Sequence, residues 1–88
     1  MVYKVARKEL MLYILGVRDG LNLLNGLLET GGKQPYYCKP HNLDLRPEQA
    51  EDIMMRYAQK YHFPDSTPIY FLLFFGLKET FPCSQSSK

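Results

Sequence analysis

The feature that most constrains this chain is the apolar run from Ile69 to Leu77, IYFLLFFGL, in which only Gly76 lacks a large apolar side chain. A helix that crosses a bilayer needs ~20 such residues, and here the charged residues Lys78 and Glu79 follow at once. We therefore expect no membrane span. A helix that is apolar on all sides is normally central in a bundle, so the run predicts a buried helix from Pro68 to about Thr80.

Two more segments show helical periodicity, one from Lys4 to Leu28 and one from Pro47 to about Tyr61. In the first, apolar residues spaced by three and four positions predict a buried stripe: Leu10, Ile14, Val17, Leu21, Leu24 and Leu28. A polar stripe lies beside it: Arg18, Asn22, Asn25 and Glu29. Together the segments predict an all-α fold, a small three-helix bundle that could include a short extra helix.

Glycine and the residues at the helix ends lead to three further expectations. Gly16 and Gly20 lie one turn apart, and their low helix propensity predicts that another helix approaches closely along that edge. Gly31 is expected to end the first helix in a left-handed conformation. Thr67 is expected to cap the start of the last one.

The 88-residue length allows one domain, residues 1–88, near the lower size limit for folding without a covalent or metal support. A net charge of +2 is too small to indicate a nucleic-acid partner. The first seventeen residues imitate a secretory signal, but Glu9 interrupts them and no small-residue cleavage site follows. We expect them to form part of the first helix, and residues 84–88 to form a flexible tail.

The connection 29–45 is long for a small bundle and contains Cys38, while Cys83 follows the last predicted helix. A bond between these cysteines would remove about 4 kcal/mol of unfolded-state freedom and would indicate an oxidising compartment. A zinc site that adds His41 and His62 is less favoured, because its ligands lack the paired spacing of structural zinc sites. A Cys/His catalytic dyad is also less favoured, because no nucleophile or phosphate-binding motif occurs. We expect no metal, no cofactor and no enzymatic activity.

Three short pieces, YILGVRDGLN, YYCKP and FGLKETFPC, occur in an order and spacing that resemble the Rap/Tai-type immunity proteins of bacterial type VI secretion. The resemblance spans roughly residues 10–83. It implies a small helical periplasmic domain with an intrachain disulfide between Cys38 and Cys83, from which the export signal has been removed. It also implies a function, the inhibition of a secreted peptidoglycan amidase by covering its active site.

Within this hypothesis, Pro64 in the HFPDST connection and Pro68 directly after it limit its freedom, so it is the segment expected to enter the amidase cleft. Its candidate contact residues are His62, Phe63 and Asp65. The aromatic residues of the last helix that a three-helix bundle cannot fully cover are candidates for a partner or homodimer contact: Phe71, Phe74 and Phe75. The alternative functions are a small periplasmic helical chaperone and a structural subunit of an envelope or secretion complex.

Overall fold

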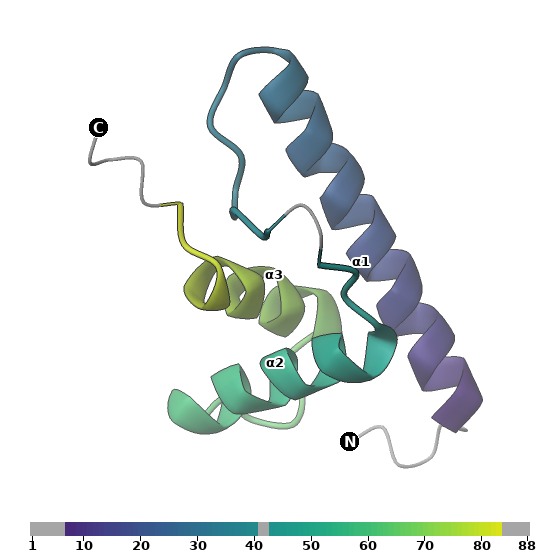
Figure 1. Ribbon diagram of the computed structural model, residues 1–88. Coiled ribbons are helices and arrows are strands. Elements are labelled where there is room, and N and C mark those ends of the chain that lie inside the picture. Colours follow the sequence, from purple (N-terminus) through teal and green to yellow (C-terminus); the bar gives the residue numbers. More distant parts are fainter. Residues whose placement is uncertain (1–6, 41–42, 84–88) are drawn as a thin grey trace.

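The computed structural model describes residues 7–40 and 43–83 and confirms the all-α fold (Figure 1). Its three helices are α1 (Arg7–Thr30), α2 (Pro47–Lys60) and α3 (Ile69–Thr80). The described ranges contain no strand and no fourth helix. None of the described helices is both long and apolar enough to cross a bilayer. The predicted tail at 84–88 and the first turn of the predicted first helix, residues 4–6, lie outside these ranges.

The end of α1 lies beyond the predicted Leu28 and is closed by backbone hydrogen bonds. The Lys33 N–H donates to the Leu28 carbonyl at 2.8 Å, and the Gly32 N–H donates to the Glu29 carbonyl at 3.0 Å. This pair of bonds is a Schellman motif, whose left-handed residue here is Gly32 with φ 76°. The prediction of Gly31 for this role was therefore wrong by one residue.

The start of α3 is set by Pro68. This residue is the N-cap, with an extended backbone, and no side chain caps the helix. Its carbonyl accepts the Leu72 N–H at 3.2 Å, which closes the first turn. The predicted Thr67 N-cap is therefore wrong, whereas Pro47 begins α2 as expected.

The hydrophobic core surrounds α3, as the apolar run predicts. Leu73 and Leu77 have no exposed surface, and Gly76 is buried between them. The rest of the core comes from α1, α2 and the connection 31–46: Leu10, Ile14, Tyr37, Leu45, Ala50, Met54 and Leu72. Each of the three helices contacts the other two, most extensively α2 with α3.

The close helix approach occurs at Gly76, and the predicted approach at Gly16 and Gly20 is wrong. A Cβ atom built on Gly76 would lie 3.0 Å from Ile53 Cγ2 and 3.3 Å from the Ile53 carbonyl oxygen. A Cβ atom on Gly16 or Gly20 would meet no atom within 4 Å. The glycine on α3 therefore lets α2 pack against it without an intervening side chain.

The helix α1 is longer than the rest of the bundle and extends beyond α2 and α3 (Figure 1). The predicted buried stripe is therefore correct only for its first part. Leu10 and Ile14 are buried and Val17 and Leu21 pack against the core, but Leu24 is 48% exposed. Where α1 extends beyond the other helices, the long connection after α1 runs alongside it (Figure 1).

The long connection is anchored by the polar stripe of α1, which sequence alone left without a role. Arg18 Nη1 donates to the Leu45 carbonyl. The Asn25 side chain donates to the Tyr37 carbonyl at 2.7 Å and accepts the Tyr36 N–H at 2.8 Å. These bonds satisfy backbone groups that a connection without secondary structure leaves unpaired.

We expect Gly76→Ala to lower the free energy of unfolding by roughly 1–3 kcal/mol, because the added methyl group overpacks the contact between α2 and α3. Gly16→Ala is the matched control, since its methyl group meets no neighbour and should raise helix stability by up to about 1 kcal/mol. Urea unfolding of both variants measures the difference. Equal stabilities of the two variants would contradict the close approach at Gly76.

Candidate functional site

The aromatic side chains of α2, α3 and the segments beside them form one continuous group, here called the aromatic cluster: Tyr36, Tyr57, Tyr61, Phe63, Phe71, Phe74 and Phe75. Ring centroids of neighbours lie close, 5.4 Å apart for Phe63 and Phe71 and 4.7 Å for Phe71 and Phe75. Edge-on and offset contacts of this kind stabilise aromatic groups beyond their burial. The structure thus brings together every phenylalanine that the sequence singled out for partner contact.

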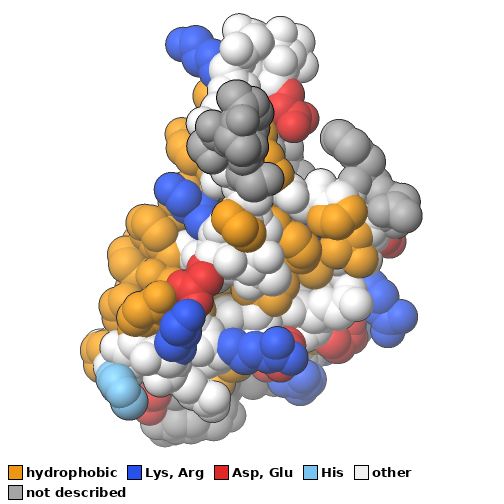
Figure 2. Space-filling view, turned by 60° about the vertical axis from the view of Figure 1, so that its left-hand side comes forward, with side chains coloured by type: hydrophobic (Ala, Val, Ile, Leu, Met, Phe, Trp, Pro, Cys, Tyr) orange, Lys and Arg blue, Asp and Glu red, His pale blue; other side chains and the backbone are white. Residues whose placement is uncertain are grey.

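The aromatic cluster contains both partly buried and exposed rings. Phe63, Phe71, Phe74 and Phe75 are partly buried, while the Tyr61 and Tyr36 side chains are 48% and 44% exposed. Figure 2 shows hydrophobic side chains exposed in several areas of one face of the molecule, with basic and acidic groups between and beside them. The bundle thus leaves part of this aromatic surface open to solvent.

Charged groups border the aromatic cluster. The Lys78 ammonium lies over the Phe74 and Phe75 rings, 5.5 and 5.8 Å from their centroids. Glu79 accepts hydrogen bonds from Lys60 Nζ at 2.5 Å and from the Tyr61 hydroxyl at 2.7 Å. The hydrogen bond from Lys60, followed by that from Tyr61, lowers the pKa of Glu79. The Tyr61 hydroxyl is held in place by the same carboxylate, and this bond raises its pKa.

The connection between α2 and α3 lies next to the aromatic cluster and has a defined backbone. The Phe63 N–H donates to the Ala58 carbonyl at 2.9 Å and the His62 N–H to the Gln59 carbonyl at 3.4 Å, again a Schellman arrangement. His62 takes the left-handed position with φ 59°, which a side chain bearing Cβ adopts at a cost. The two remaining candidates, His62 and Asp65, are exposed and lie outside the ring contacts.

The two cysteines are joined, as the resemblance implies. The Cys38–Cys83 bond links the long connection to the segment after α3, and the Cys38 N–H donates to the Phe81 carbonyl at 2.8 Å. Because both sulfur atoms take part in the disulfide, neither is available as a thiolate ligand or as a nucleophile. The described residues contain no cluster of metal-ligating side chains, and His41 lies outside them.

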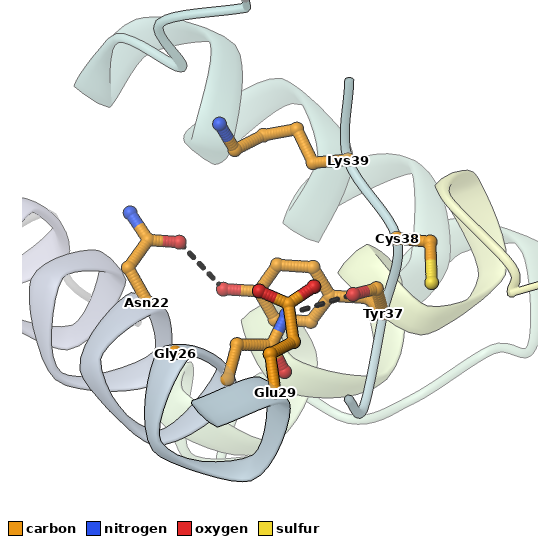
Figure 3. A pocket seen from close by; sticks show the side chains of 7 residues that line it. Asn22, Gly26, Glu29, Tyr37, Cys38 and Lys39 are labelled. Atoms are coloured by element: carbon orange, nitrogen blue, oxygen red, sulfur yellow. Dashed lines mark hydrogen bonds between the residues drawn. The ribbon is translucent and has the colours of Figure 1, made fainter. Parts of the chain in front are cut away.

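A polar pocket between α1 and the long connection was not predicted from the sequence (Figure 3). It has a volume of about 300 Å³ and is lined by Asn22, Asn25, Gly26, Glu29, Tyr37, Cys38 and Lys39. The Tyr37 side chain is 2% exposed, and its hydroxyl donates to Asn22 Oδ1 at 2.7 Å. Burial raises the pKa of Tyr37 to about 12, against a weaker opposing effect of Arg18. The spacing of the polar stripe on α1 was the available signal for this arrangement.

We expect the buried Tyr37 hydroxyl to make stability depend on pH above about 10. The pKa is raised in the folded state, so the stabilisation is complete below the ordinary tyrosine pKa of about 10 and is lost as the pH rises towards about 12. A shift of this size corresponds to a loss of roughly 2–3 kcal/mol. Urea unfolding across this pH range measures it, with Tyr37→Phe as the comparison. An equally steep loss in Tyr37→Phe would show that other groups cause it.

We expect His62→Gly to raise the free energy of unfolding by roughly 0.5–1 kcal/mol, because glycine adopts the left-handed conformation without Cβ strain. His62→Ala removes the same imidazole but retains Cβ, so it should not gain stability. Thermal and urea unfolding of the pair separate backbone strain from the imidazole. A gain in both variants would mean that the side chain, and not the backbone, destabilises this position.

No family model, curated protein or solved structure matches this chain. Its proposed function therefore rests on the resemblance of the three short sequence pieces, together with the residues and contacts described above.

Proposed function

We propose that this protein is a periplasmic immunity-type inhibitor that binds a secreted peptidoglycan amidase and covers its active site. The observation that carries the proposal is the aromatic cluster, which places Phe63, Phe71, Phe74 and Phe75 in one partly open surface. Tyrosine and phenylalanine are enriched at the centres of protein interfaces, where they provide large rigid contacts. Such a surface suits a tight protein partner better than a small substrate.

The shape of the site supports a rigid docking element. The connection 61–68 is fixed at its start by the bonds of Phe63 and His62 to α2, and its Thr67 N–H donates to the Pro64 carbonyl at 3.0 Å. An ordered segment loses little conformational entropy when it enters a cleft. The left-handed backbone at His62 is also of the kind that accumulates at functional sites.

The border of the aromatic cluster supports polar recognition around an apolar centre. Tyr61 is held by Glu79, and Lys78 keeps an exposed ammonium over two rings. A polar rim around buried aromatic residues is the usual anatomy of a specific interface. The partner surface should therefore offer an apolar projection with a carboxylate beside it to meet Lys78.

The disulfide supports the proposed location. Disulfides persist in oxidising compartments such as the bacterial periplasm, where peptidoglycan is also found. The bond holds the connection that supplies Tyr36, which contacts Phe74 with centroids 5.1 Å apart. Formation of the disulfide and the position of Tyr36 in the aromatic cluster thus depend on the same connection.

The test is binding and inhibition of purified peptidoglycan amidases, beginning with those encoded next to this gene. We expect one amidase to bind with a submicromolar Kd and to stop releasing labelled peptidoglycan fragments. The variants Tyr61→Ala, His62→Ala and Asp65→Arg should each weaken binding about tenfold or more, because they change exposed groups at the docking surface.

Tyr70→Ala is the matched control, since Tyr70 is an aromatic residue 58% exposed on α3 that makes none of the ring contacts of the aromatic cluster. Its Kd should change less than about twofold. Circular dichroism should show that all four variants remain helical. If no amidase binds or loses activity, or if the variants at Tyr61, His62 and Asp65 bind as tightly as the control, the proposal is wrong.

A further inference from the structure

The polar pocket between α1 and the long connection takes no part in the proposed inhibition, and its lining contains opposite charges. The Glu29 carboxylate comes from the last turn of α1, and the Lys39 ammonium comes from the connection. In the part of the chain that the structure describes, neither of them forms an ion pair with the other or with a third residue. The pocket thus presents a positive and a negative group that do not neutralise each other by direct contact.

The lining also keeps hydrogen-bond donors that are not used within the described ranges. Asn22 Oδ1 accepts the Tyr37 hydroxyl at 2.7 Å, and Figure 3 shows the amide nitrogen of Asn22 turned away from that hydroxyl. Lys39 Nζ donates to the Leu43 carbonyl at 2.6 Å, which uses one of its three N–H groups. Asn22 and Lys39 can therefore both donate to a ligand, whereas the Glu29 carboxylate can only accept.

The wall of the pocket on α1 is formed by one face of the helix. Asn22, Gly26 and Glu29 are spaced by four and three residues, so they follow one another along the same side. A Cβ atom on Gly26 would meet nothing within 4 Å, so the pocket reaches the helix backbone at this position. Its volume of about 300 Å³ is at the lower end for ligand sites, and suits a molecule of few atoms.

We propose that this pocket binds a free α-amino acid with a short side chain. The ligand carboxylate accepts hydrogen bonds from Lys39 and Asn22, and the ligand ammonium donates to Glu29. A simple anion would meet the like charge of Glu29, and a simple cation would meet that of Lys39. A molecule that carries both charges on one small carbon framework satisfies both walls.

The walls are held in place before a ligand arrives. The Asn25 side chain donates to the Tyr37 carbonyl at 2.7 Å, and the buried Tyr37 hydroxyl bonds to Asn22. Cys38 ties the same connection to the segment after α3. Little ordering is therefore needed on binding, which favours affinity. Glu29 is exposed and Lys39 is half-buried, so solvent weakens the charge pairs and a Kd of about 1 mM is expected.

The test is a titration of the native, disulfide-bonded protein with free alanine, followed by the NMR shifts of its backbone amides. We expect saturable shifts at Gly26 and Lys39 with a Kd of about 1 mM or lower. Acetate and ethylammonium, which each carry one of the two charges, should bind at least tenfold more weakly. No saturable shift up to about 20 mM alanine, or acetate binding as tightly as alanine, would overturn the proposal.

Variants of the charged groups test the placement of the ligand. Glu29→Gln and Lys39→Met each remove one charge at similar size, and each should weaken alanine binding at least tenfold. Glu29 makes no side-chain hydrogen bond or ion pair within the described residues, so Glu29→Gln should leave the fold unchanged even if Lys39→Met does not. Alanine binding to Glu29→Gln with the parent's Kd would overturn the proposal.

Filling the pocket tests its location. Gly26→Leu should abolish alanine binding, because its side chain occupies the space above the helix backbone. Gly20→Leu is the matched control on α1, since Gly20 also has no neighbour within 4 Å but does not line the pocket, and its Kd should change less than about twofold. Unchanged binding in Gly26→Leu would place the ligand elsewhere and overturn the proposal. The pocket shares no residue with the aromatic cluster, so amidase inhibition and alanine binding can fail independently.

Discussion

The burial of Tyr37, together with the disulfide formed by the next residue, holds this small bundle together. The two anchors fix the long connection against α1 through the Tyr37 hydroxyl and against the end of α3 through Cys83. A domain of this size buries a comparatively small fraction of its surface, so its helices alone would be only marginally stable. The connection 31–46 therefore packs against the three helices and contributes Tyr37 and Leu45 to the core.

This arrangement separates the molecule into two surfaces with different chemistry. Close to the disulfide and α3, the aromatic cluster combines half-buried rings with the paired charges of Lys60 and Glu79. Along α1, which extends beyond its partners, exposed leucine and tyrosine side chains lie beside the exposed Gly16 and Gly20. The proposed inhibition depends on the first of these surfaces.

Much of the fold could be predicted because it follows from periodicity. The three helices, the central position of α3 and the start of α2 at Pro47 all depend on local pattern and proline chemistry. The sequence indicated Phe63 and the three phenylalanines of α3 as separate candidates and did not predict that they form one cluster, since an all-apolar helix does not reveal which rings a small bundle leaves open. The errors concern contacts between distant segments: Gly76, and not Gly16 or Gly20, lies at the close approach. The polar stripe of α1 was visible in the sequence, but its partners, the backbone groups of residues 36, 37 and 45, were not.

The sequence by itself determined the helices and their order, because hydrophobic spacing, prolines and glycines act over a few residues. Pairing of the two cysteines was already favoured by their number and placement. Only the tertiary structure decided how far α1 extends beyond the bundle, and therefore that Leu24 is exposed where the same pattern predicted burial. It also decided that Tyr37 is buried with its hydroxyl bonded to Asn22. The physical reason is that burial depends on which segments contact one another, and these contacts are set by packing across the whole chain.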